Sequence, residues 1–118
     1  MLDSKKIICA LDFNDLLKAV NFVNKINYNI IFKVGMEFFY NFGIDGVKKL
    51  RKVKPDIKIF LDLKLHDIPN TVSSSLYPLI KNIRPYMITL HVSGGSAMLK
   101  GAVDAVNQIC HERGLEKP

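Results

Sequence analysis

Apolar residues gather in four short runs along the chain, and the stretches between the runs show the three-to-four-residue spacing of amphipathic helices. The runs are rich in β-branched residues and apolar at nearly every position, which is typical of strands covered on both faces. Strand and helix therefore alternate, and this alternation predicts a parallel sheet of the α/β class. The expected strands span residues 7–11, 30–34, 57–63 and 87–92.

Capping and turn residues predict where the intervening helices begin and end. Asn14 is the expected N-cap of the first helix, because its side chain can accept a backbone N–H of the first turn. Pro69 suits the first turn of the third helix, since its fixed φ is already helical, and Gly114 suits the end of the fourth. The second helix is expected between Gly43 and Pro55, and the fourth is expected to open at residues 93–95.

Four consecutive βα units amount to half of a parallel (β/α)₈ barrel, the TIM-barrel architecture. We expect residues 1–118 to form a single domain that corresponds to the first four units, with the C-terminal half of the barrel absent. In such a half-barrel the first and last strands have unpaired edges, which favours association with another chain.

The composition fits a globular protein, because 48% of the 118 residues are apolar and only five are proline and seven glycine. The first apolar run is too short for a signal peptide or a membrane span. The two cysteines, Cys9 and Cys110, show no metal-ligand spacing. The sequence therefore predicts a cytoplasmic protein with free thiols, without a bound metal and without a membrane segment.

The net charge is +6, from 17 basic and 11 acidic residues, which suits either nucleic acid or a phosphorylated small molecule. The densest group of basic side chains lies between residues 48 and 54. Val47, Leu50 and Val53 occur among them at helical spacing, and no aromatic residue is interleaved. We interpret this group as the solvated face of a helix and expect no nucleic-acid partner.

Charged residues stand at or near the end of every predicted strand. Functional groups of (β/α)₈ barrels lie at the C-terminal ends of the strands, so these residues are candidates for an active site. They are Asp12 after the first run, Lys33 in the second, Asp62 and Lys64 in the third, and His91 in the fourth. A histidine at a strand end is as often a hydrogen-bonding residue of the fold as a catalytic one, so His91 is the weakest candidate.

The third strand carries the most informative pair. Side chains alternate along a strand, so Asp62 and Lys64 are expected on the same face. Asp67 on the next loop and Lys33 on the neighbouring strand extend the pair to an expected array of two ammonium groups and two carboxylates. Burying one such charge alone is costly. An ion-pair network that only ties the barrel together is the alternative, but hydrophobic residues would serve that purpose as well.

Residues 62–71 read D-L-K-L-H-D-I-P-N-T, which closely resembles the D-x-K-x-x-D-I-P-N-T signature of the orotidine 5′-phosphate decarboxylases. Three further segments, residues 10–12, 32–35 and 91–95, resemble the same family in the same order. The resemblance extends over essentially the whole chain, which has about half of the family's usual length.

The resemblance implies a lyase that converts orotidine 5′-monophosphate to uridine 5′-monophosphate (UMP) and carbon dioxide, the last step of de novo pyrimidine biosynthesis, without metal or organic cofactor. Lys64 would be the proton donor, and Asp62 would lie beside the substrate carboxylate. Lys33 would hold Asp62 and the ribose hydroxyls, and Asp12 would bind a ribose hydroxyl.

The family resemblance also implies a homodimer in which Asp67 and Thr71 reach the partner's site. Asp67 is for that reason expected among the catalytic residues, and both residues among those that bind substrate. The loop and arginine that grip the substrate phosphate belong to the second half of the family's barrel, and the present sequence contains no phosphate-binding element that we can identify.

Two other functions fit parts of the pattern. A magnesium-dependent sugar-phosphate decarboxylase or aldolase of the same barrel group shares the D-x-K-x-x-D core, but the extension at residues 68–71 argues against it. A truncated, non-catalytic half-barrel remnant is the second alternative, because the phosphate grip would be missing.

Overall fold

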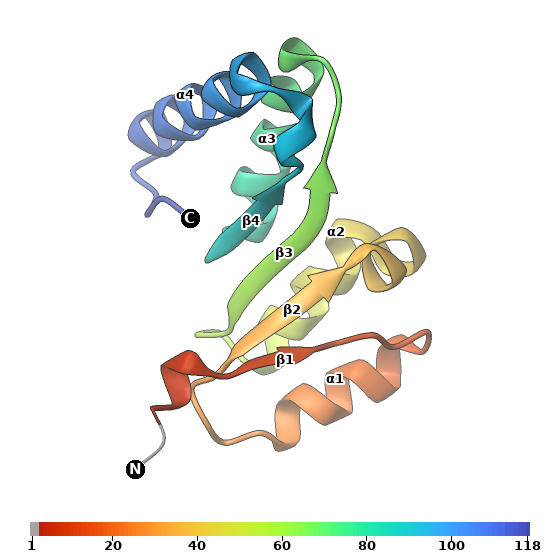
Figure 1. Cartoon of the computed structure of the whole chain (residues 1–118). Helices are drawn as coiled ribbons and strands as arrows, with labels where there is room; N and C mark the ends of the chain where they lie inside the picture. The colour runs from red at the N-terminus through yellow and green to blue at the C-terminus, as the bar shows by residue number, and fades with distance from the viewer. Residues whose placement is uncertain (1–2) are drawn as a thin grey trace.

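A computed structural model describes residues 3–118, and its four strands form one parallel sheet in the order β1-β2-β3-β4 (Figure 1). Consecutive strands pair with each other, so each crossover leads to the adjacent position in the sheet. The predicted parallel α/β sheet is confirmed. The strands are β1 (Ile8–Ala10), β2 (Ile31–Gly35), β3 (Lys58–Leu65) and β4 (Met87–Leu90).

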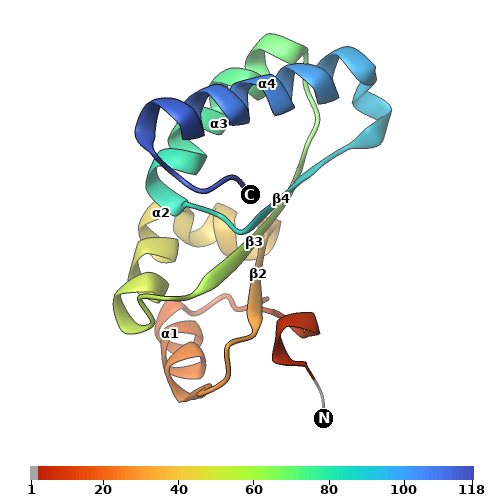
Figure 2. The same ribbon diagram turned by 90° about the vertical axis from the view of Figure 1, so that its left-hand side faces the viewer.

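Each strand is followed by a long helix, and two short 3₁₀ helices complete the chain. Figure 2 shows α1, α2 and α3 on one side of the strands, so this face of the sheet is covered. The helices are α1 (Leu16–Lys25), α2 (Met36–Val53), α3 (Pro69–Ile83) and α4 (Ser96–Arg113), with η1 (Ser4–Lys6) before β1 and η2 (Val92–Gly94) before α4.

One predicted helix start is wrong, and another marks only the second part of a longer helix. The N-cap of α1 is Asp15 and not Asn14, because the Asp15 carboxylate accepts the backbone N–H of Lys18 at 3.1 Å. A carboxylate is the stronger partner for the positive end of a helix. The second helix begins at Met36, before Gly43, but a kink at Gly43 with a φ of +58° divides it into two segments, and the second of these begins after Gly43 as predicted.

Other predicted boundaries agree with the structure. Pro69 is in the first turn of α3, and Gly114 ends α4 in the left-handed conformation that favours glycine. The fourth helix is preceded by η2 rather than opening directly at residues 93–95.

The hydrophobic core lies between the sheet and the helices that cover it. Phe32 and Val34 on β2 and Ile59 and Leu61 on β3 are fully buried in this core. Side chains alternate along a strand, so Lys33, which stands between Phe32 and Val34, points to the opposite face. A second apolar cluster joins α3 and α4 and consists of Val72, Leu76, Ile80, Met98, Ala102, Ile109 and Cys110.

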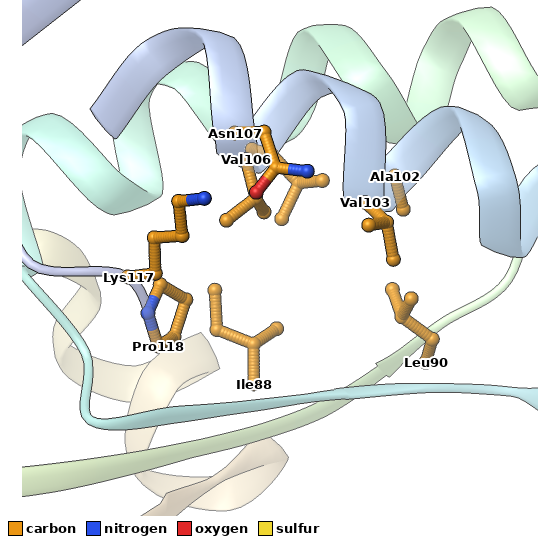
Figure 3. Close-up of a pocket in the computed structure, with 9 residues that line it drawn as sticks. Ile88, Leu90, Ala102, Val103, Val106, Asn107, Lys117 and Pro118 are labelled. Atoms are coloured by element: carbon orange, nitrogen blue, oxygen red, sulfur yellow. The ribbon is translucent and has the colours of Figure 1, made fainter. Parts of the chain in front are cut away.

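An apolar groove of about 220 Å³ lies between β4 and α4 (Figure 3). Ile88 and Leu90 line it from the strand, and Val103 and Val106 line it from the helix. None of the charged strand-end residues lines this groove, so the groove is distinct from the site that those residues form.

Candidate active site

Three of the predicted charged residues meet at the C-terminal ends of β2 and β3. The Lys64 Nζ lies 2.9 Å from Asp62 Oδ1, and the Lys33 Nζ lies 3.5 Å from Asp62 Oδ2. Asp62 is the buried member, with 9% of its side chain exposed, whereas 30% of Lys33 and 53% of Lys64 are exposed. One buried carboxylate thus holds two ammonium groups that still reach solvent.

The strand register explains why Asp62 and its neighbours gather at this point. Asp62 is paired with Gly35 in the β2–β3 ladder, so no side chain of β2 stands beside it there. A Cβ added at Gly35 would lie 3.8 Å from Asp12 Oδ1, which places the Asp12 carboxylate next to the end of β2. The structure therefore brings Asp12 to the same edge of the sheet as the other three residues.

The backbone of Lys64 departs from the regular strand geometry that the alternation of side chains assumes. Its φ is +50°, in the left-handed region that residues other than glycine seldom adopt. Asp62 and Lys64 do share one environment, as expected, but a local distortion of β3 brings them together. Simple alternation of side chains is an incomplete description of this segment.

A residue that the sequence reasoning missed, Thr89 on β4, belongs to the same cluster. Its hydroxyl donates to Asp62 Oδ1 at 2.8 Å and accepts the backbone N–H of Lys64 at 3.0 Å. Thr89 is the one polar residue within Met87–Leu90, the part of the fourth run that becomes β4. That polarity is a usable signal, but threonine is also a common strand former, and the apolar run concealed it.

Opposing effects act on the pKa of the Asp62 carboxyl. Burial alone would raise this pKa, because a charged carboxylate is poorly solvated there. Hydrogen bonds from Lys64 and Thr89, the charge of Lys64 and the hydrogen bond from Lys33 outweigh burial and hold the pKa below its ordinary value. Asp62 is therefore an ionised carboxylate at neutral pH.

Asp67 does not join this ion-pair network. The predicted array of two ammonium groups and two carboxylates within one chain is wrong, because the Asp67 carboxylate instead accepts the backbone N–H of Ile68 at 2.7 Å. Within residues 3–118, the ion pairs are those that Asp62 forms with Lys33 and Lys64. Asp67 lines a separate hollow of about 490 Å³ between the loops that follow β3 and β4, and Thr71 is exposed nearby on α3.

His91 has a clear role in the local structure. Its Nδ1 accepts the backbone N–H of Ser93 at 3.3 Å and so caps η2. Its ring also stacks on His66, with the ring centroids 4.7 Å apart. These contacts join the loops after β3 and β4. They correspond to the alternative in which His91 is a hydrogen-bonding residue of the fold and not a catalytic one.

Across residues 3–118, no three His, Cys, Asp or Glu side chains come close enough together to hold a metal ion. The same part of the chain contains no helix that is both long and apolar enough to cross a membrane.

Comparisons with known proteins agree with the motif. An orotidine 5′-phosphate decarboxylase from Wolbachia pipientis subsp. Culex pipiens is 46% identical over 101 residues, which cover 85% of this chain and 43% of the relative. The enzyme of the same name from Fusobacterium nucleatum is 48% identical over 109 residues, or 88% of this chain and 43% of the relative. The chain thus spans less than half of the length of these relatives.

A solved structure shows the same relation in three dimensions. The crystal structure of orotidine 5′-phosphate decarboxylase from Lactobacillus acidophilus superposes with a TM-score of 0.77 at 41% identity, covering 89% of this chain and 46% of that one. Four parallel βα units that match about half of such a structure define the chain as a portion of a (β/α)₈ barrel with a lysine–carboxylate cluster at the C-terminal ends of its strands. The family model described as "Orotidine 5'-phosphate decarboxylase / HUMPS family" matches residues 5–114. The chain belongs to this family.

Proposed function

We propose that this chain carries the decarboxylation site of an orotidine 5′-phosphate decarboxylase, a lyase that converts orotidine 5′-monophosphate to UMP and carbon dioxide in pyrimidine biosynthesis. The observation that carries the proposal is the buried Asp62 carboxylate with two ammonium groups at the C-terminal ends of β2 and β3. The identity of 46–48% to enzymes of that name supports the choice of substrate.

Lys64 is the proton donor of the proposed reaction. The bond between the ring carbon C6 and the carboxylate breaks, its electron pair stays on C6, and carbon dioxide leaves. An ammonium group held at C6 stabilises this negative charge and then transfers a proton to it. Lys64 fits because its Nζ is already fixed by Asp62 and 53% of its side chain is exposed toward an incoming substrate. The neutral amine that remains regains its proton from water.

Asp62 and Lys33 prepare the site for this step. Asp62 remains ionised because hydrogen bonds and nearby charge outweigh its burial, and we place it beside the substrate carboxylate, whose departure relieves their repulsion. Lys33 holds the second oxygen of Asp62 and extends toward the ribose hydroxyls. Asp12 lies at the end of the neighbouring strand and binds a ribose hydroxyl.

The functional assembly that we propose is a cytoplasmic homodimer without metal or organic cofactor. Asp67 and Thr71 lie outside the ion-pair cluster of their own chain, which suits residues that reach the site of a partner chain. The phosphate contacts are assigned to the part of the barrel that the longer relatives contain and that residues 1–118 do not match. Residues 1–118 then act as one barrel half, with its own share of the site.

The test is the decarboxylation of orotidine 5′-monophosphate by the 118-residue chain, followed as loss of ultraviolet absorbance. Turnover by the wild-type chain is expected to disappear in Lys64→Ala and to persist in Lys100→Ala, which removes an exposed lysine of α4. Turnover that survives in Lys64→Ala would contradict the role of Lys64.

Two further results would overturn other parts of the proposal. Turnover abolished by a chelator and restored by magnesium would favour the sugar-phosphate enzymes of the barrel group. A folded wild-type chain that leaves the absorbance unchanged would refute catalysis by this chain alone.

A further inference from the structure

The hydroxyl of Thr89 connects the side chain of one candidate catalytic residue to the backbone of another. It donates to Asp62 Oδ1 at 2.8 Å and accepts the backbone N–H of Lys64 at 3.0 Å. Asp62 Oδ1 is also the oxygen that binds the Lys64 ammonium at 2.9 Å. Thr89, Asp62 and Lys64 therefore form a closed hydrogen-bonded ring.

An irregularity in the sheet creates the need for this hydroxyl. The β3–β4 ladder pairs Leu61 with Ile88 and then Leu65 with Leu90. Three residues of β3, at positions 62–64, thus face the single residue Thr89 of β4. The extra residues form a bulge in which the ladder supplies no backbone acceptor for the N–H of Lys64, and the threonine hydroxyl takes that place.

The same bulge places Lys64 in a costly backbone conformation. A φ of +50° is unfavourable for a residue with a Cβ, so surrounding contacts must hold it. The bond from Lys64 N to Thr89 is one such contact. Conformations of this kind concentrate at functional sites, where they aim a side chain.

The direction of each hydrogen bond in the ring is fixed by chemistry. A backbone N–H only donates, so Thr89 Oγ1 must accept from Lys64. Asp62 is ionised, so its Oδ1 can only accept, and the single hydroxyl hydrogen of Thr89 is donated to it. The directions in the ring thus follow from the backbone N–H of Lys64 and from the carboxylate form of Asp62.

We infer that Thr89 is a positioning residue for the proposed decarboxylation, which fixes the backbone of Lys64 within the bulge and keeps the Asp62 carboxylate oriented toward the Lys64 ammonium. This inference rests on the proposed function only for its catalytic consequence. The hydrogen-bonded ring itself is a property of the folded chain and can be tested without substrate.

Two substitutions separate the hydroxyl from the rest of the side chain. Thr89→Val keeps the β-branched shape of a good strand former but removes the hydroxyl, whereas Thr89→Ser keeps the hydroxyl and removes the methyl group. If the hydroxyl is responsible, Val disrupts the ring and Ser preserves it. If packing of the methyl group is responsible, Ser is the damaging change.

The first readout is amide hydrogen exchange at Lys64 in the folded chain. Protection is expected in the wild type and in Thr89→Ser, and exchange at least about tenfold faster is expected in Thr89→Val, because one hydrogen bond is lost. The NMR titration of the Asp62 carboxyl is expected to move to higher pH in Thr89→Val only, since a hydrogen bond that lowers its pKa is removed. Unprotected exchange at Lys64 in the wild type would overturn the inference even if Thr89→Val failed to fold.

The second readout is turnover of orotidine 5′-monophosphate. Thr89→Val is expected to lower kcat by about tenfold to a hundredfold with KM changed by less than about threefold, because the loss lies in the placement of the proton donor and not in binding. Thr89→Ser is expected to retain kcat within about threefold. Equal kcat values in Val and wild type, or a loss in Ser as large as in Val, would refute the positioning role. Absence of turnover in the wild type would instead count against the proposed function and leave the exchange and titration results to decide on Thr89.

Discussion

The two edges of the sheet both hold charged side chains, but these side chains bind different partners. At the C-terminal ends of the strands, Asp62 binds the side chains of Lys33, Lys64 and Thr89. At the N-terminal ends, cations bind backbone carbonyls, with Lys54 Nζ donating to Ile26 O at 3.1 Å. The C-terminal edge therefore brings charged side chains together, whereas the cations at the N-terminal edge connect segments of the backbone.

Arg51 shows most clearly how the N-terminal edge works. Its guanidinium donates to the carbonyls of Ile83 at 2.8 Å and Ile57 at 3.2 Å, with longer bonds to Pro55 and Arg84. It thereby ties the loops that lead into β3 and β4. Burial, and then repulsion from Arg84, lower the pKa of Arg51, so the carbonyls must compensate for poor solvation.

The comparison teaches that the partner of a charge indicates its role better than its burial does. A guanidinium that serves four carbonyls through both of its terminal nitrogens has four of its five N–H donors engaged, and it contributes to stability. An ammonium that shares one carboxylate with a second ammonium, and is half exposed, can turn toward a substrate. This division agrees with (β/α)₈ barrels in general, in which the C-terminal face carries function and the N-terminal face stability.

The largest effect is expected from a change at the C-terminal edge. Asp62→Asn keeps the size of the side chain but removes the charge that holds both ammonium groups, so turnover is expected to fall by about 10³-fold or more. The free energy of unfolding is expected to change by less than about 1 kcal/mol, because both lysines can turn to water. Steady-state kinetics and urea unfolding measure the two quantities. A large loss of stability with little loss of turnover would show that Asp62 serves the fold, as Arg51 does, and not the reaction.

The reverse result is expected at the N-terminal edge. Arg51→Leu leaves several carbonyls without their donor, and we expect the free energy of unfolding to fall by about 3 kcal/mol. Turnover per folded molecule is expected to stay within about twofold of wild type. Arg51→Lys is the matched control, since it keeps the charge but not the planar set of donors. Its free energy of unfolding is expected to lie between those of the wild type and Arg51→Leu. A specific loss of kcat in folded Arg51→Leu would contradict the assignment of function to the C-terminal edge and of stability to the N-terminal edge.

Acid sensitivity gives the smallest expected effect. The pKa of Asp62 is lowered in the folded state, so its ionisation stabilises the fold above the unfolded-state pKa of about 4. That contribution is lost as the pH falls through the lowered folded-state pKa. Urea unfolding between pH 6 and the lowest pH at which the chain stays folded is therefore expected to show a shallower acid decline for Asp62→Asn than for wild type. Identical declines would mean that Lys33, Lys64 and Thr89 do not lower the pKa of Asp62 in the folded state.

The fold was largely predictable because its strands are short apolar runs and its helices carry proline and glycine at their ends. The meeting of Asp62, Lys33 and Lys64 was also predictable, because strand ends of a parallel sheet lie at one edge. Thr89 was not, since its role depends on the bulge between β3 and β4. A shift of strand register leaves no periodic mark in the sequence.

The basic segment between residues 48 and 54 shows a second limit. The interpretation as a solvated helix face holds for the exposed Lys48, Lys49 and Lys52 but is wrong for Arg51 and Lys54. The acceptors of these two side chains include carbonyls of distant segments, up to 33 residues away in sequence. Helical spacing identifies the face of a helix, but it does not show which loops pass beneath it.

The most direct test of the difference between the two edges is a backbone NMR titration of the chain with UMP, the proposed product, which is not consumed. Binding is expected to shift the signals of Lys33, Asp62 and Lys64 at the C-terminal ends of β2 and β3 and to leave those of Arg51 and Lys54 unchanged. Shifts centred on Arg51 and Lys54, or no shift at any nucleotide concentration in a folded chain, would contradict the assignment of chemistry to the C-terminal edge.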